Sequence, residues 1–227
     1  MIKFYFNSAP NPMKVALFLE EAGLAYEPMP VDGRKGDQHK PEYVKINPNA
    51  KVPSIVDDGV TVFDSNAILL YLAEKTGKFL PPKTPANRAD LLSWLMFVAS
   101  GIGPYSGQSV HFQHMAPEKI AYATNRYRFE AMRHYTIVNE RLANRKYMVG
   151  ETYTIVDMAL WGWARLIPFV LDKEAFGKLA NLKRLVEEVE ARPAAQAALK
   201  LKDRFTWKTE MDEEAKRHMF RHLAVQA

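Results

Sequence analysis

The segment IKFYFNSAPNPMKVALFLEEAG, residues 2–23, predicts a strand, a loop and a helix in close succession. Apolar side chains alternate with more polar ones over residues 2–6, which indicates a strand. Asn11 is a favoured helix N-cap and is followed by a proline suited to the first helical position, so a helix is predicted over residues 13–22. Gly23 is the expected helix stop. This unit is typical of the start of an α/β domain.

Three further strands and one helix extend this pattern along the chain. Strands are predicted over residues 26–31, 54–56 and 61–63, and the turn at 57–59 (Asp-Asp-Gly) favours an antiparallel hairpin between the last two. A helix is predicted over residues 64–75. The first helix makes strands one and two a parallel crossover. The order β-α-β-β-β-α, with or without an extra helix before the third strand, is that of a thioredoxin-like domain.

The proline-rich segment LPPKTPA, residues 80–86, separates this region from a helical one, because proline does not fit a helix interior or a central strand. From there the apolar period changes to that of helices. Helices are predicted over residues 87–114, 117–144, 154–171, 174–191 and 194–203, with a weaker helical pattern from Met211 to Leu223. We therefore expect a thioredoxin-like domain at residues 1–80, a linker at 81–86, and an all-helical domain with a C-terminal tail at 87–227.

Composition excludes several classes of function. The 227 residues include no cysteine, so any thiol chemistry must use a thiol that a ligand supplies. The net charge is +5, but basic and acidic residues are interleaved along the chain, so we expect no nucleic-acid partner and consider a small anionic ligand compatible. The apolar runs are too short to span a membrane, and the first residues lack a signal-peptide pattern. We expect a cytoplasmic protein with no membrane partner.

The loop from Ser8 to Asn11 is the first candidate site. A helix start favours an anion and lowers the pKa of a thiol held there, because its first N–H groups are unpaired and its dipole is positive. Asn11 can donate its side-chain amide to a bound sulfur, and the Ser8 hydroxyl is a possible second donor. The alternative is that Asn11 only caps the helix.

Two other loops carry candidate binding residues. The Val52–Pro53 bond is a candidate cis peptide, and a bend there could present the backbone of Val52 to a bound peptide. Asp64 and Ser65 open a helix, where a hydroxyl and free amides can bind a carboxylate. Each feature also has a purely structural explanation, because Pro53 can begin an edge strand and Asp64 with Ser65 can act as helix caps.

Taken together, the strings SAPNPMKV (8–15), NPNAKVP (47–53) and FDSNAILLYL (63–72), with Gly36-Asp37-Gln38 and Pro41-Glu42-Tyr43, resemble the glutathione-binding domain of glutathione transferases. The run from Thr154 to Asp157 resembles the capping box of that family's helical domain. Residues 103–112 resemble the bacterial Nu-class disulfide-bond reductases and the transferase-like domain of the yeast nitrogen regulator.

This resemblance implies a role for each matching residue. Asn11 would face the glutathione sulfur, Val52, followed by Pro53, would pair its backbone with the cysteinyl unit, and Asp64 and Ser65 would bind the γ-glutamyl end. Gln38 and Lys51 would approach the glycyl carboxylate. The resemblance also implies a homodimer, in which Gln108, Arg126 and Arg133 would lie on the partner-subunit or electrophile side. Salt bridging at the surface is the alternative for the two arginines.

The resemblance implies an enzyme that holds glutathione as a thiolate and uses it for disulfide-bond reduction or conjugation to electrophiles, with peroxidase activity as a further possibility. Disulfide reduction would need a second glutathione, because the chain has no thiol of its own. One residue departs from the family pattern: many Nu-class members have threonine where this chain has Ala9. The yeast regulator also has alanine there, so the alternative is a glutathione-binding regulatory module with little turnover.

The remaining polar and aromatic candidates have structural interpretations. The pairs His111 with His114 and His218 with His222 lack a third ligand, so no metal is expected. Tyr5 lies inside the first strand and is interpreted as structural. The aromatic residues of the helical region are expected to be mostly core, with some of them lining an apolar electrophile pocket; they are Trp94, Phe97, Tyr105, Phe112, Trp161 and Trp163.

Overall fold

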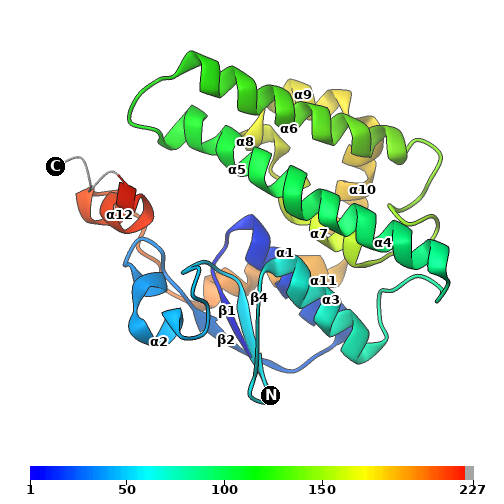
Figure 1. Cartoon of the computed structure of the whole chain (residues 1–227), viewed down its shortest axis with the longest axis horizontal. Coiled ribbons are helices and arrows are strands. Elements are labelled where there is room, and N and C mark those ends of the chain that lie inside the picture. Colours follow the sequence, from blue (N-terminus) through cyan, green and yellow to red (C-terminus); the bar gives the residue numbers. More distant parts are fainter. Residues whose placement is uncertain (223–227) are drawn as a thin grey trace. The chain divides into compact units, whose positions relative to one another are not determined.

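The computed structural model describes residues 1–222 and divides into two compact units (Figure 1). The first unit contains residues 1–71 together with the C-terminal segment from Gln196, and the second contains Leu72–Ala195. The C-terminal segment therefore groups with the N-terminal unit, whereas the sequence analysis placed it with the helical domain. The linker at 81–86 stays a prediction, and residues 223–227 of the expected tail lie outside the described residues.

A four-stranded mixed sheet forms the centre of the first unit. Its strands are β1 (Ile2–Phe6), β2 (Tyr26–Pro30), β3 (Ser54–Asp57) and β4 (Val60–Phe63), in the spatial order β2-β1-β3-β4. β1 pairs with β2 in parallel and with β3 in antiparallel orientation, and β3 and β4 form the expected hairpin. The predicted strands and the thioredoxin-like order are confirmed.

The helices of this unit are α1 (Pro10–Ala22), a 3-10 turn η1 (Asp37–His39), α2 (Pro41–Val44) and the start of α3 (Ser65–Thr76). The prediction that Asn11 caps α1 is wrong: Ala9 is the N-cap and Pro10 is the first helical residue. Both Pro10 and Pro12 are tolerated because the first residues of a helix have no intrahelical acceptor for their N–H groups. Gly23, with φ of 64°, ends the helix as predicted.

The core of the first unit packs α1 against the sheet. Phe4 and Phe6 of β1 and Phe18 of α1 are fully buried. The C-terminal segment extends this core, because the ring of Phe6 contacts the rings of Phe205 and Trp207. That segment contains the end of α11 (Pro193–Lys200), the 3-10 turn η4 (Leu201–Arg204) and α12 (Glu213–Met219). The predicted tail helix is thus shorter than expected, and its last residue, Leu223, lies outside the described residues.

The second unit is helical, and its helices α4, α5 and α6 are drawn in shades of green in Figure 1. Its elements are α4 (Pro85–Phe97), η2 (Val98–Ile102), α5 (Gly103–Val110), η3 (His111–Met115), α6 (Ala121–Arg141), α7 (Ile155–Ala164), α8 (Ile167–Val170), α9 (Lys173–Lys178) and α10 (Ala180–Glu190). Between Leu72 and Ala195 the only β pairing is two isolated bridges, Tyr147 with Gly150 and Val149 with Thr152. None of the helices in residues 1–222 is long and apolar enough to cross a membrane.

Several predicted helices are divided in the structure. The helix predicted over 87–114 contains the π-helical segments η2 and η3. η2 ends at Ile102, two residues before Pro104, whose ring and missing N–H are incompatible with a regular α-helical turn. Pro168 likewise lies at the start of the separate helix α8. The capping box of Thr154 and Asp157 at the start of α7 is confirmed.

Candidate functional site

The strand register brings the predicted loops of the first unit to one end of the sheet. Tyr5 pairs with Ser54, and Ser54 pairs with Phe63. Phe6 pairs with Pro30. The same end of the sheet therefore holds four loops: those that follow β1, β2 and β4, and the one that precedes β3. Every binding residue predicted in this unit lies in one of these loops or in the first helical turn that follows it.

The β1–α1 loop places Asn11 in the first turn of α1. Asn11 is half-buried, whereas Ser8 and Ala9 are exposed. The side chain of Asn7 accepts the N–H of Ala9 at 3.0 Å, which fixes the loop. No acidic residue lies in the first turn to neutralise the positive end of the helix dipole. A bound anion would therefore meet Asn11 and the positive end of α1.

The loop before β3 is held by hydrogen bonds from Tyr43 and Asn47. The backbone carbonyl of Lys51 accepts hydrogen bonds at 2.6 Å from both the Tyr43 hydroxyl and the Asn47 side chain. The Val52–Pro53 peptide is cis, as the sequence predicted. Val52 precedes the first paired residue of β3 and so lies outside the sheet ladder, and the Lys51 side chain is exposed.

The start of α3 combines a cap with a buried hydroxyl. Asp64 adopts a left-handed conformation, with φ of 71°, and its carboxylate accepts the N–H groups of Asn66 and Ala67 at 2.9 and 3.1 Å. The cap does not use the N–H of Ser65. The Ser65 hydroxyl is buried and accepts a hydrogen bond from the ammonium of Lys14 at 3.4 Å. Capping and ligand binding are therefore compatible here.

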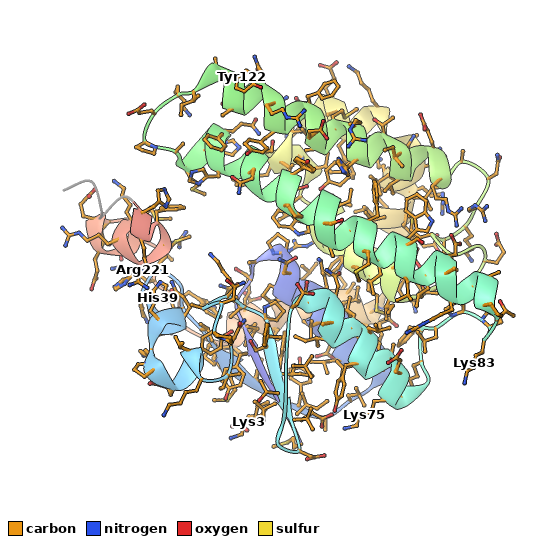
Figure 2. The ribbon with its side chains drawn as sticks, viewed as in Figure 1. Lys3, His39, Lys75, Lys83, Tyr122 and Arg221 are labelled. Carbon is orange, nitrogen blue, oxygen red and sulfur yellow. The ribbon has the colours of Figure 1, made fainter. Side chains whose placement is uncertain are left out.

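Gln38 is held by the C-terminal segment. Its amide nitrogen donates to the backbone oxygens of Gly33 and His218, each at 3.2 Å, and its buried Oε1 has no hydrogen-bond partner. The Nε2 atom of His39 also lies 2.9 Å from the His218 oxygen, and Figure 2 shows His39 beside α12. Both amide hydrogens of Gln38 are thus engaged in this conformation.

Two backbone contacts hold the same segment further upstream. The guanidinium of Arg34 donates to the Lys208 oxygen at 2.8 Å, and the Lys208 N–H donates to the carboxylate of Asp32 at 2.7 Å. The loop after β2 and residues 208–218 therefore form one hydrogen-bonded layer.

The second unit contains the other predicted site residues. Gln108 is exposed on α5. Arg126 and Arg133 both bind the buried carboxylate of Glu130, at 3.0 and 2.8 Å, and hydrogen bonding by Arg133 lowers the pKa of Glu130. Salt bridging, the alternative role predicted for these two arginines, is therefore present. Both side chains nevertheless remain about half exposed.

The histidine pairs have separate partners. His114 stacks on Phe169 and contacts its backbone oxygen, whereas the ring of His111 packs on Phe112. Among residues 1–222, no three His, Asp or Glu side chains are grouped closely enough to hold a metal ion. Of the aromatic candidates, Trp161 is fully buried and the others are half-buried.

Sequence reasoning missed Lys14 and the role of the C-terminal segment. Lys14 has a recognisable signal, because it is the one basic residue in an otherwise apolar run that is buried on every side from Pro12 to Leu19. Burial lowers the pKa of Lys14 from 10.5 to about 7, partly offset by the nearby Asp64 carboxylate. The contact of Gln38 with His218 spans 180 residues and has no local sequence signal.

Comparison with known proteins identifies relatives of both units. Family models for the N-terminal and C-terminal domains of glutathione S-transferase match residues 1–74 and 98–193. The disulfide-bond oxidoreductase YfcG of Escherichia coli K12 is 44% identical over 206 residues, which cover 88% of this chain and 94% of that protein. Protein URE2 of Eremothecium gossypii is 40% identical over 151 residues, which cover 63% of this chain and 43% of that protein.

A solved structure supports the same relationship. A glutathione transferase family member from Pseudomonas fluorescens, crystallised with two glutathione bound, has a TM-score of 0.82 and 36% sequence identity to this chain. The match covers 87% of this chain and 92% of that one.

Proposed function

Because the chain belongs to the glutathione S-transferase family, we propose that it binds glutathione as a thiolate at the start of α1 and uses the sulfur as a nucleophile. The observation that carries the proposal is the convergence of the four loops at one end of the sheet. With no cysteine in the sequence, the ligand supplies the thiol.

In this proposal Asn11 is the principal donor to the sulfur, with the Ser8 hydroxyl as the second. The positive end of α1 favours the thiolate over the thiol. The backbone of Val52 pairs with the cysteinyl unit, next to the cis Pro53. At the γ-glutamyl end, Ser65 offers its N–H and hydroxyl to the carboxylate, and Asp64 faces the ammonium.

The glycyl end depends on Lys51 and Gln38. Lys51 is exposed and free to turn toward a carboxylate. Gln38 can donate to the ligand only if it gives up its bond to Gly33 or to His218. We therefore assign the first contact with the glycyl carboxylate to Lys51, and a contact from Gln38 to a state in which α12 has released its amide.

Among the reactions open to such a site, we propose disulfide reduction first. The bound thiolate attacks one sulfur of a disulfide, which forms a mixed disulfide and expels the other sulfur as a thiolate. A second glutathione thiolate then attacks the glutathione sulfur of the mixed disulfide, which yields glutathione disulfide and the second substrate thiol. The relative with two glutathione molecules bound supports this stoichiometry. Conjugation to an electrophilic carbon uses the same nucleophile.

A homodimer and a cytoplasmic location belong to the same proposal. Tyr122, Arg126, Phe129 and Arg133 follow each other at helical spacing on α6, and Tyr122 and Phe129 are 81% and 64% exposed (Figure 2 labels Tyr122). We propose this face, with Gln108 on α5, for the partner-subunit or electrophile side. Light scattering, which separates a 25.9 kDa monomer from a dimer of about twice that mass, tests the assembly.

The alternative function is a glutathione-binding regulatory module with little turnover. It is favoured by the similarity to URE2 and by Ala9, which removes a hydroxyl near the proposed sulfur position.

Enzyme assays separate the two functions. We expect glutathione-dependent reduction of a small disulfide well above the uncatalysed rate, and we expect Asn11→Ala to lower it roughly 10- to 100-fold, as for the loss of a hydrogen bond to a charged group. Asn144→Ala, an exposed asparagine of the second unit, is the matched control and should leave the rate unchanged. If glutathione binds but neither disulfide reduction nor aromatic conjugation exceeds background, the enzyme assignment is wrong and the regulatory module remains.

A further inference from the structure

Lys14 of α1 is fully buried, and its ammonium group lies beside the start of α3. Lys14 is the fifth residue of α1 and is 1% exposed. Its ammonium reaches the Ser65 hydroxyl at 3.4 Å. Of the titratable groups in the described residues, Asp64 is the one whose charge acts on Lys14. Asp64 itself is exposed and already caps α3, so Lys14 has no buried carboxylate partner among these residues.

A lysine is a costly choice for this position on structural grounds. Removing an ammonium from water costs several kcal/mol unless it is fully paired, whereas an apolar side chain of similar length would fill the same space without that cost. The residues before and after it, Met13 and Val15, are indeed apolar and buried. The feature that needs an explanation is therefore the position of the ammonium group, next to the Ser65 hydroxyl at the start of α3.

The hydrogen-bond chemistry of Lys14 and Ser65 supplies one. An ammonium group can only donate, so Ser65 Oγ must accept from Lys14 when the lysine is charged. The hydroxyl hydrogen of Ser65 is then left to be donated elsewhere. A neutral lysine can instead accept that hydrogen, which would turn the hydroxyl away from a ligand.

We propose that Lys14 is a positioning residue for the γ-glutamyl carboxylate, which orients the Ser65 hydroxyl toward the ligand and stabilises the carboxylate from behind. This inference rests on the proposed function, because it concerns the ligand placed at Ser65. It adds a charge to a site otherwise formed by one hydroxyl and backbone N–H groups.

A consequence is that ligand binding and protonation of Lys14 are linked. The pKa of Lys14 lies at about 7 because burial lowers it, so near pH 7.5 the unliganded protein holds this lysine largely neutral. A bound carboxylate favours the charged form and raises the pKa. Binding should therefore take up a fraction of a proton at pH 7.5, and affinity should fall as the pH rises above about 7.

Calorimetry with S-methylglutathione tests this linkage. The methyl group removes the titrating thiol, whose ionisation would otherwise release a proton. Titrations at pH 7.5 in two buffers of different ionisation enthalpy give the number of protons taken up. Wild-type protein should take up a fraction of a proton on binding. Lys14→Met should take up much less and should bind S-methylglutathione roughly 10- to 100-fold more weakly. The control Lys3→Met changes an exposed lysine of β1 and should match wild type.

Ser65→Ala and the double variant test whether Lys14 acts through Ser65. We expect the two losses of affinity to be far from additive, because each variant breaks the same hydrogen bond. Wild-type binding without proton uptake overturns the proposal even if Lys14→Met does not fold, and so does a Lys14→Met variant with wild-type affinity. If wild type fails to bind S-methylglutathione at all, the proposed function itself is wrong.

Discussion

Asn11 carries the only backbone N–H among the first three residues of α1, because Pro10 and Pro12 have none. The start of this helix is therefore a poorer source of donors than a helix start usually is. Stabilisation of a thiolate there rests on the Asn11 side chain, its single N–H and the helix dipole. This makes Asn11 the most sensitive position of the proposed site, all the more because Ala9 offers no hydroxyl.

At Lys14 the structure predicts a pH-dependent contribution to stability. The pKa is about 7 in the folded protein and 10.5 in the ordinary, solvated state. Between these values the unfolded chain binds more protons, so the stability of the folded state rises with pH across this window; below pH 7 the buried charge has its full cost. Lys14→Met should therefore be more stable than wild type at pH 6, and the difference should shrink toward pH 10.

Urea unfolding of both proteins at several pH values measures this difference. Lys3→Met controls for the loss of one positive charge at the surface. A stability difference between wild type and Lys14→Met that does not change with pH would show that Lys14 is not held in a site that opposes its charge.

Several residue roles could be anticipated from the sequence because they depend on local chemistry. Each of three confirmed features involves residues only a few positions apart in the chain: the cis Val52–Pro53 bond, the Asp64 cap and the capping box of α7. The position of Asn11 within α1 was misjudged by two residues, because two prolines both fit a helix start. The bond from Gln38 to His218 depends on tertiary packing and could not be anticipated.

At the level of the elements, α7 depends on the cap formed by Asp157. One carboxylate oxygen accepts the Met148 N–H at 2.8 Å, and the other accepts the Thr154 N–H at 2.8 Å and its hydroxyl at 3.2 Å. The group is fully buried. Both oxygens are thus needed as acceptors.

Asp157→Asn should destabilise the protein by about 1–3 kcal/mol, because the amide nitrogen would face an N–H group and leave a buried donor unpaired. Thermal unfolding at pH 7 measures this loss, with the exposed Asp203→Asn as control. Equal stability of the two variants would contradict the assigned role of the cap.

Helix lengths in the second unit were less predictable than helix positions. The apolar period runs through residues 87–114 and predicts one helix, but it does not reveal the π-helical turns η2 and η3 within that range. The break between α9 and α10 at Leu179 likewise leaves the apolar period nearly unchanged. Periodicity reports which face is buried rather than where the backbone hydrogen bonds change.

For the whole molecule, the absence of cysteine and the strand register lead to one account. The register gathers the candidate residues at one end of the sheet, and the sequence offers no thiol to place there. We therefore propose that the protein acts by binding glutathione, which supplies the reactive thiol.

The most direct test of that account is the thiol pKa of bound glutathione, followed by the ultraviolet absorbance of the thiolate as pH is raised. Bound to wild-type protein, the thiol should titrate at least about one unit below its value of roughly 8.5 in free solution, and Asn11→Ala should return it most of the way. Glutathione that binds with an unchanged thiol pKa, or that does not bind, would contradict the claim that α1 holds the sulfur as an anion.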